Sequence, residues 1–353
     1  MINEKLLESC MDSIIGTKQV YSAVMRVESG DGSFAWTGAR GEMQADSKYF
    51  IASVTKMYVT AVIMSLAHEN KLSLNDKISK YIDAKYMEGL HVYKGVDYSG
   101  EITVMHLISN TSGIPDYFFY KEKGKPAAAD SLFAGADEAW GFDKTIAAVK
   151  NMKPKFAPGT KVAYSDPNYQ LLGKIIEAVT GKEDGDVFKE RIFDVLKLPN
   201  SYMYENPNDK SPVAFYYKDK KTWLPNYMAS VGAEGGIVST AEDVMIFTKA
   251  FFGGRFFPKE KIEGLKKWRM LLPPPGLFYF GIGLEKMPAP RIMTPFKPIK
   301  EIVGFWGQTG SFSWYNTDAD LYFTGTANQC NGRGHNAAGK AIFKIIQNNI
   351  NKF

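Results

Sequence analysis

The sequence predicts an α+β protein in which one sheet is built from both ends of the chain and a mainly helical segment is inserted between them. Two observations lead to this prediction. Near the N-terminus a helical pattern precedes two strand patterns, and near the C-terminus three strand patterns precede a helical one. Between these ends, the apolar residues recur mostly at helical spacing.

The N-terminal elements are a helix and a hairpin. Apolar side chains in residues 2–15 recur at the i, i+3/i+4 spacing of an amphipathic helix. Acidic residues interrupt this segment, which excludes a signal peptide, so we expect a cytoplasmic protein unless a leader has been removed. Strands are predicted over Gln19–Glu28 and Ser33–Ala39, joined by a turn at residues 29–32.

The C-terminal elements are three strands and a helix. Strands are predicted over Glu301–Trp306, Ser311–Asn316 and Leu321–Ala327. The helix that follows places apolar residues between Ala338 and Ile346 on one face. Strands from both termini therefore contribute to the same predicted sheet.

The middle of the chain is predicted to be mostly helical. Val54–Glu69 is apolar nearly all round, which indicates a buried central helix. Further helices are predicted over Val104–Ser109, Tyr169–Val179 and from the N-cap Thr240 to Phe251. The proline-rich stretch 273–298 is expected to be rich in loops.

Composition excludes several classes of function. The 353 residues suggest about two domains, and the net charge of +5 comes from charges spread along the chain, without the basic stripe typical of a nucleic-acid partner. No apolar run is long enough for a transmembrane helix, so no membrane partner is expected. Cys10 and Cys330 form no zinc motif, although a single bridge between them is left open. We expect no metal and no cofactor, and the sequence gives no oligomeric state.

The first candidate for chemistry is Ser53-Val-Thr-Lys56, at the start of the buried helix. The two side chains share one helix face a turn apart, within hydrogen-bond reach. Serine becomes a nucleophile when a neighbour takes its proton, and burial at the positive end of a helix favours the neutral lysine that can do so. A chance match remains the alternative interpretation, because the chain is rich in lysine.

Two further strings complete the candidate site. Tyr164-Ser165-Asp166 lies just before a predicted helix, where a tyrosine can transfer protons to and from a serine. Gly307-Gln308-Thr309-Gly310-Ser311 opens a predicted strand, and the amide hydrogens of Ser53 and Ser311 can converge on one oxyanion. Taken alone, each string is more simply explained as an ordinary turn.

Together, in this order, the three strings resemble the serine β-lactamase family in its class C branch, with the related DD-peptidases, esterases and D-aminopeptidases. Family-like strings at 108–117, 235–243 and 279–283 extend the resemblance over nearly the whole chain. It implies an antiparallel sheet flanked by the terminal helices, formed by residues 1–50 and 225–353, with a mainly helical lobe at 51–224. The site is expected in the cleft between them.

The resemblance also implies roles for the site residues. Ser53 is the expected nucleophile, with Lys56 and Tyr164 as the proton-transfer pair. Asp166 is expected to orient its neighbours, and the string Gln308-Thr309-Gly310 to line the site. Aromatic residues in 117–120 and 278–280 are candidates for an acyl pocket, although packing is the more common role of such residues.

The sequence departs from the family pattern at two positions. Asp166 stands where the family usually has asparagine, and Gln308 where it usually has lysine or histidine. A substrate carboxylate is therefore disfavoured. We expect a serine hydrolase acting on a small ester or amide. The alternatives are a D-aminopeptidase or amidase, with Asp166 pairing the substrate ammonium, and a catalytically impaired penicillin-binding-like protein.

Overall fold

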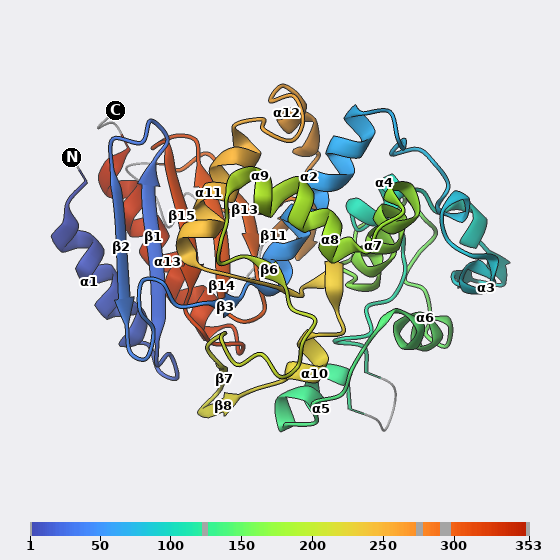
Figure 1. Cartoon of the computed structure of the whole chain (residues 1–353), viewed down its shortest axis with the longest axis horizontal. Helices are drawn as coiled ribbons and strands as arrows, with labels where there is room; N and C mark the ends of the chain where they lie inside the picture. The colour runs from blue at the N-terminus through green and yellow to red at the C-terminus, as the bar shows by residue number, and fades with distance from the viewer. Residues whose placement is uncertain (1, 122–125, 273–277, 290–297, 351–353) are drawn as a thin grey trace.

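The central element of the computed structural model is an eight-stranded antiparallel sheet with the order β10-β11-β12-β13-β14-β15-β1-β2 (Figure 1). The structure describes residues 2–121, 126–272, 278–289 and 298–350. Strands from the two ends of the chain meet where β1 pairs with β15, as the sequence predicts. The strands are β1 (Ala23–Ser29), β2 (Ala35–Arg40), β10 (Arg269–Leu272), β11 (Phe278–Phe280), β12 (Glu285–Met287), β13 (Ile302–Trp306), β14 (Ser311–Asn316) and β15 (Leu321–Thr326).

Helices cover both faces of this sheet. The terminal helices α1 (Glu4–Ile15) and α13 (Arg333–Asn349) pack together on one face, and α11 (Ala241–Phe252) lies on the other (Figure 1). Successive strand residues point to opposite faces, so Val24 joins the core beneath α11 and Met25 the core beneath the terminal helices. The predicted flanking of the sheet by the terminal helices is confirmed.

The segment between the two sets of strands is mainly helical. Its central helix α2 (Thr55–His68) is buried nearly all round, as its uniformly apolar sequence predicts. The other α-helices are α3 (Ala84–Met87), α4 (Val104–Ile108), α5 (Ala128–Ala134), α6 (Phe142–Lys150), α7 (Pro167–Thr180), α8 (Asp184–Phe188), α9 (Asp194–Leu196), α10 (Pro225–Met228) and α12 (Lys261–Leu265). Short 3₁₀ or π-helical turns are η1 (Ala52–Val54), η2 (Ile78–Lys80), η3 (Ser99–Glu101), η4 (Lys189–Phe193) and η5 (Gly232–Glu234).

Three small sheets lie outside the central one. β9 (Ile237–Ser239) pairs with both β3 (Tyr49–Phe50) and β6 (Tyr202–Met203). The remaining pairs are β4 (Val92–Tyr93) with β5 (Val96–Asp97), and β7 (Phe215–Tyr217) with β8 (Lys220–Thr222). Because β3 ends just before Ser53, the small sheet with β9 at its centre fixes the chain as it enters the candidate site.

The predicted secondary structure holds best where the patterns are long. The hairpin, the three C-terminal strands and the helices at 55–68, 167–180 and 241–252 all form. The strands β10, β11 and β12 were not predicted, because three or four residues are too few to establish an alternating pattern. Parts of the stretch 273–298 lie outside the described residues. The division into lobes at 1–50 with 225–353 and at 51–224 stays a prediction.

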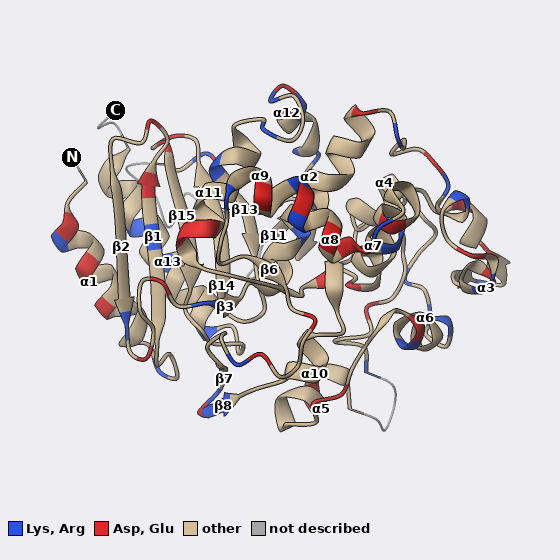
Figure 2. Ribbon diagram, viewed as in Figure 1, with Lys and Arg blue, Asp and Glu red and all other residues tan. Residues whose placement is uncertain are grey.

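Charged residues of both signs are interspersed over the ribbon in the view of Figure 2. Among the described residues, no helix combines the length and apolarity that a membrane crossing requires. Cys10 and Cys330 are both buried and free, so the disulfide that the sequence left open does not form.

Candidate active site

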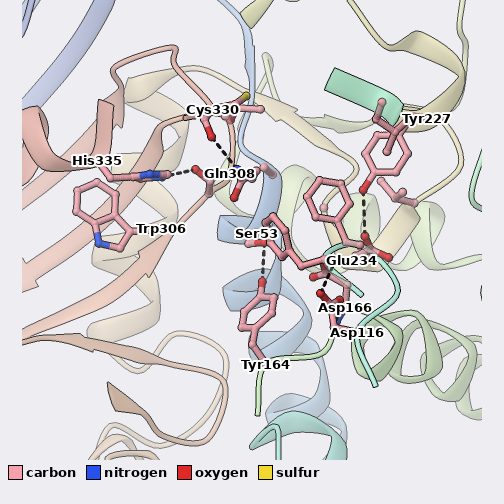
Figure 3. Close-up of a pocket in the computed structure, with 18 of the residues that line it drawn as sticks. Ser53, Asp116, Tyr164, Asp166, Tyr227, Glu234, Trp306, Gln308, Cys330 and His335 are labelled. Atoms are coloured by element: carbon pink, nitrogen blue, oxygen red, sulfur yellow. Dashed lines mark hydrogen bonds between the residues drawn. The ribbon is translucent and has the colours of Figure 1, made fainter. Parts of the chain in front are cut away.

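A cavity of about 470 Å³ lies where the start of α2 meets the turn between β13 and β14 (Figure 3). Its lining includes Ser53, Tyr164 and Asp166, together with Gln308 and Thr309. These residues come from three distant parts of the chain. They are the residues that the sequence analysis expected in one site. The rest of the lining is largely apolar and is contributed mostly by the helical segment.

Ser53 lies in the 3₁₀ turn η1, immediately before α2. Ala52, the residue before it, has a φ of +46°, a left-handed conformation that costs a residue with a side chain of order 1 kcal/mol or more. Two side chains, one from the turn between β13 and β14 and one from the start of β14, hold the chain just before Ser53 by hydrogen bonds. Thr309 Oγ1 donates to the carbonyl of Phe50 at 2.7 Å, and Ser311 Oγ donates to that of Ile51 at 2.6 Å.

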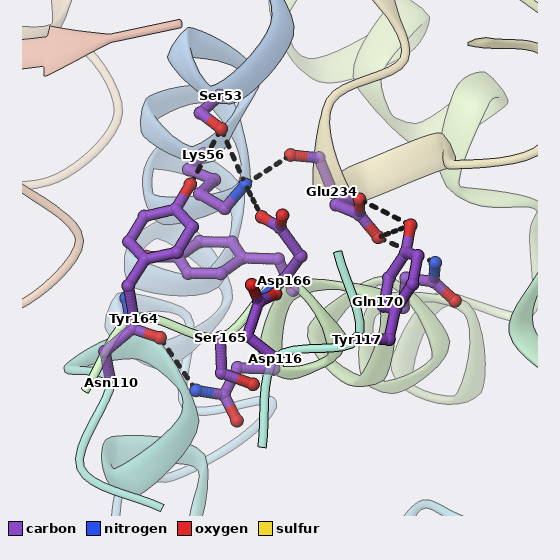
Figure 4. A network of polar contacts seen from close by, with 12 residues as sticks. Ser53, Lys56, Asn110, Asp116, Tyr117, Tyr164, Ser165, Asp166, Gln170 and Glu234 are labelled. Atoms are coloured by element: carbon purple, nitrogen blue, oxygen red, sulfur yellow. Dashed lines mark hydrogen bonds and ion pairs between the residues drawn. The ribbon is translucent and has the colours of Figure 1, made fainter. Parts of the chain in front are cut away.

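Lys56 is fully buried, and its amine contacts three acceptors (Figure 4). Nζ donates to Ser53 Oγ at 3.1 Å and to the main-chain carbonyl of Glu234 at 2.6 Å. It also lies 2.7 Å from Asp166 Oδ1. The Lys56 amine is thus held between the hydroxyl of Ser53, a main-chain carbonyl and a carboxyl group. The one-turn spacing predicted from the sequence thus brings Lys56 into contact with Ser53.

Tyr164 also contacts Ser53, and its ring lies beside the Lys56 amine, with 5.2 Å between Nζ and the ring centroid. Its hydroxyl donates to Ser53 Oγ at 2.7 Å. Burial, and after it the nearby carboxyls of Asp166 and Glu285, raise the pKa of Tyr164 well above its ordinary value. The resting phenol is therefore neutral, which disfavours a tyrosinate as the resting base.

Two further carboxyl groups, those of Asp116 and Glu234, lie near Asp166, and neither of them was assigned a role from the sequence (Figure 4). Asp116 accepts from the main-chain amides of Asp166 and Phe119, each at 3.2 Å. Burial, followed by the charge of Asp166, raises the pKa of Asp116 to about 7. Two carboxyls so close together cannot both ionise easily.

Glu234 is the third carboxyl, and both of its oxygens are hydrogen-bonded. They accept from Gln170 Nε2 at 2.7 Å and from Tyr117 OH at 2.9 Å. Burial and the nearby Asp166 raise the pKa of Glu234 well above its ordinary value. The Glu234 side chain holds η5 in place, and η5 presents the carbonyl that binds Lys56.

The residues of the third string differ in their relation to the cavity. Gln308 Nε2 donates to the carbonyl of Cys330 at 2.8 Å, which fixes the orientation of its amide at the cavity edge (Figure 3). Gly310 has a φ of +87° and closes the turn before β14. Ser311 is buried with its hydroxyl on Ile51, so only its main-chain amide is available for the predicted oxyanion contact.

Only one of the two aromatic segments contributes to the lining of the cavity. Phe118 and Phe119 line the cavity, whereas residues 278–280 do not. Sequence reasoning gave no role to Asp116, although this residue lies in the family-like string at 108–117, and it missed Glu234. Among the described residues, no cluster of histidine, cysteine and carboxylate side chains is arranged to hold a metal ion.

Glu285 is a further buried carboxyl that lines the cavity. Its Oε2 accepts from the amide of Trp306 at 2.9 Å, and burial raises the pKa of Glu285 from 4.5 to about 8. Between these pH values the folded chain retains a proton that the unfolded chain has lost. The free energy of unfolding should therefore fall as the pH rises, by up to about 1.4 kcal/mol per unit.

We predict that Glu285→Gln removes this part of the pH dependence, because glutamine keeps the acceptor and does not titrate. The measurement is the free energy of urea unfolding of both proteins between pH 7 and 8. This interval is chosen because it lies above the pKa of Asp116, which is about 7. The wild type should lose stability more steeply than the variant over this interval. Parallel curves would show that Glu285 is already ionised at neutral pH.

The chain matches the family model named Beta-lactamase over residues 10–346. It is 27% identical over 218 residues to the D-alanyl-D-alanine-carboxypeptidase/endopeptidase AmpH of Escherichia coli (strain K12), covering 61% of this chain and 52% of that protein. The match thus spans about half the length of this relative.

Two solved structures show the same fold. A D-stereospecific amidohydrolase from Streptomyces sp. superposes with a TM-score of 0.78 at 23% identity, covering 95% of this chain and 98% of that one. EstCE1, described as a hydrolase with promiscuous acyltransferase activity, superposes with a TM-score of 0.78 at 17% identity, covering 97% of both chains.

Proposed function

The chain belongs to the β-lactamase family, and we propose that it is a serine hydrolase that cleaves a small ester or amide through an acyl-enzyme on Ser53. The observation that carries this proposal is the pair of hydrogen bonds at Ser53 Oγ, from Lys56 Nζ at 3.1 Å and from Tyr164 OH at 2.7 Å. A serine needs a neighbour to take its proton, and both neighbours lie within reach.

Lys56 and Asp166 together act as the base in this proposal. The Lys56 ammonium must lose a proton before it can accept the one on Ser53, and Asp166 Oδ1, at 2.7 Å, is placed to take it. The serine proton then moves to Lys56 as Oγ bonds to the substrate carbonyl carbon. The oxyanion that forms accepts from the main-chain amides of Ser53 and Ser311.

Tyr164 acts as the acid in the same scheme. Its phenol is neutral because burial raises the pKa of Tyr164, so it holds a proton for the leaving oxygen or nitrogen. When the bond to the leaving group breaks, that proton transfers and a phenolate remains. The water that attacks the acyl-enzyme gives a proton to the Tyr164 phenolate. The Ser53 oxygen then leaves with the proton held by Lys56, and Asp166 returns its proton to Lys56, which restores the resting state.

The charges around the cavity support a substrate without a carboxylate. Gln308 contributes no positive charge. Four carboxyl groups line the cavity, but burial raises the pKa of Glu234 and of Glu285, so the negative charge that a substrate carboxylate meets near neutral pH comes from Asp166 and Asp116. Lys155 is a cation on the cavity lining, but its side chain is exposed, so solvent screens its charge. A neutral ester or amide meets none of the repulsion that a carboxylate would meet.

The same carboxyls favour a second candidate, an amidase for substrates that carry an amine. Gln308 Nε2 is held by Cys330, so its amide oxygen is the atom left to accept from a substrate N–H group. An ammonium group would also be attracted to Asp116 or Asp166. The D-stereospecific amidohydrolase among the solved structures is consistent with this candidate.

Labelling by a fluorophosphonate probe tests the proposal. We predict that the probe modifies Ser53 alone, detected by intact mass and peptide mapping, because Ser53 is in contact with both proton-transfer side chains. Ser311→Ala serves as the control, since the Ser311 hydroxyl is committed to Ile51. Modification elsewhere, or none in protein that hydrolyses esters, would refute the role of Ser53.

A substrate panel separates the candidates. p-Nitrophenyl esters report the esterase, D-amino-acid p-nitroanilides the amidase, and nitrocefin a β-lactamase. Labelling of Ser53 without turnover of any of these compounds would favour the impaired penicillin-binding-like protein.

A further inference from the structure

The lining of the catalytic cavity has two chemically different parts. The polar part holds Ser53 and its proton-transfer neighbours. The other part is an apolar wall, which we define as Phe118, Leu132, Phe133, Phe215, Leu224 and Met228. These side chains come from α5, β7, the start and end of α10 and the loop after α4. Each is at most 9% exposed, so they form a fixed surface.

The apolar wall is rigidly packed as well as buried. Phe118 meets Phe133 edge to face, with ring centroids 5.9 Å apart, and lies 5.9 Å from the ring of Tyr227. Aromatic pairs at this separation attract beyond the area they bury. A preformed apolar surface beside a reacting group binds a substrate without the cost of ordering side chains.

The mouth of the cavity carries apolar side chains that nothing in the described chain covers. Phe119 is 55% exposed and Leu272 is 52% exposed, and both line this cavity from different parts of the fold. Exposed apolar surface that continues into a cavity marks a place where a ligand is bound. The apolar lining thus continues to solvent-exposed side chains at the edge of the cavity.

We propose that the acyl group of the substrate is bulky and apolar, with six or more carbon atoms, and lies against the apolar wall. This inference rests on the proposed function and adds its substrate class. Tyr164, which serves the leaving group, lies on one side of Ser53, and Tyr227, next to the wall, lies on the other (Figure 3). The wall therefore faces the acyl half of the substrate and not its leaving group.

A series of p-nitrophenyl esters from acetate to octanoate tests this assignment. Each methylene buried against the wall is worth about 0.8 kcal/mol, so kcat/KM should rise by about fourfold per methylene, after correction for the alkaline hydrolysis rate of each ester. A second series varies the alcohol at constant hexanoyl group, and should be nearly flat. A flat acyl series, or a steeper alcohol series, would overturn the proposal.

Two variants locate the effect. Met228→Trp adds bulk to the wall and should lower the ratio of octanoate to acetate kcat/KM at least tenfold. Met270→Trp is the matched control, because Met270 is 51% exposed on β10 and does not line the cavity. The ratio of octanoate to acetate kcat/KM for this variant should equal that of the wild type. Equal ratios in all three proteins would contradict a role of the wall in acyl binding.

A binding experiment distinguishes failure of this inference from failure of the proposed chemistry. Calorimetry on Ser53→Ala should show tighter binding of octanamide than of butanamide, by at least tenfold. Tight binding without hydrolysis by the wild type would refute the hydrolase and retain the apolar site. Hydrolysis with equal binding of both amides would retain the hydrolase and refute the apolar site.

Discussion

Replacing Ser53 by alanine is expected to lower kcat for ester hydrolysis by about 10⁴-fold or more, because no other hydroxyl contacts both proton-transfer groups within the described residues. Lys56→Met and Tyr164→Phe should each cost about 10²- to 10⁴-fold, the range for general acid–base catalysis. The measurement is steady-state kinetics on a p-nitrophenyl ester near neutral pH.

The combined variants distinguish one proton-transfer unit from independent contributions. Both side chains act on the same Ser53 oxygen, so the double variant Lys56→Met/Tyr164→Phe should lose far less than the product of the two single losses. Losses that multiply fully would show that Lys56 and Tyr164 act independently.

Folding must be controlled in the same series. Removing Lys56 leaves the buried Asp166 carboxyl without its cation, which can cost about 3–5 kcal/mol of stability. Lys56→Met/Asp166→Asn removes both charges and should recover much of that loss without recovering kcat. Urea unfolding therefore separates the structural from the catalytic effect of Lys56.

Sequence reasoning found the parts of the site that local spacing determines. Ser53 and Lys56 meet because they lie one helical turn apart, which a sequence displays directly. The strings that hold Tyr164 and Gln308 were candidates from their residues, but only the family resemblance joined them to Ser53, since no local rule brings distant loops to a helix start. Tyr164 and Gln308 lie in one cavity with Ser53 because of the way the central sheet packs against the helical segment.

The residues that were missed act in ways that a sequence does not display. Glu234 contacts Lys56 through its main-chain carbonyl, a group that every residue possesses. Asp116 matters because burial beside Asp166 raises the pKa of Asp116 to about 7, and burial is a property of the tertiary fold. Ala52 has a left-handed φ, although alanine, unlike glycine, has no preference for this conformation that a sequence would reveal.

A lysine at position 308 is expected to direct the site toward substrates that carry a carboxylate. Two opposite unit charges 4 Å apart attract by about 4 kcal/mol at an effective dielectric of about 20, and each 1.36 kcal/mol is a tenfold change in rate. Gln308→Lys should therefore speed acylation by a fluorescent penicillin about ten- to a thousandfold. Gln308→Met, of similar length and without charge, is the control and should give no gain.

Adding Asp166→Asn to Gln308→Lys should increase the gain, because it removes the carboxyl that opposes a substrate carboxylate. Asp166 also contacts Lys56 at 2.7 Å, so this change lowers ester hydrolysis as well. The informative quantity is thus the ratio of the second-order penicillin acylation rate to kcat/KM for a neutral ester, measured for each variant. High salt should narrow the differences only modestly, because Asp166 is 7% exposed and screened little by ions. Rapid acylation of the wild type, or an unchanged ratio in folded, ester-active variants, would show that charge at positions 166 and 308 does not select the substrate.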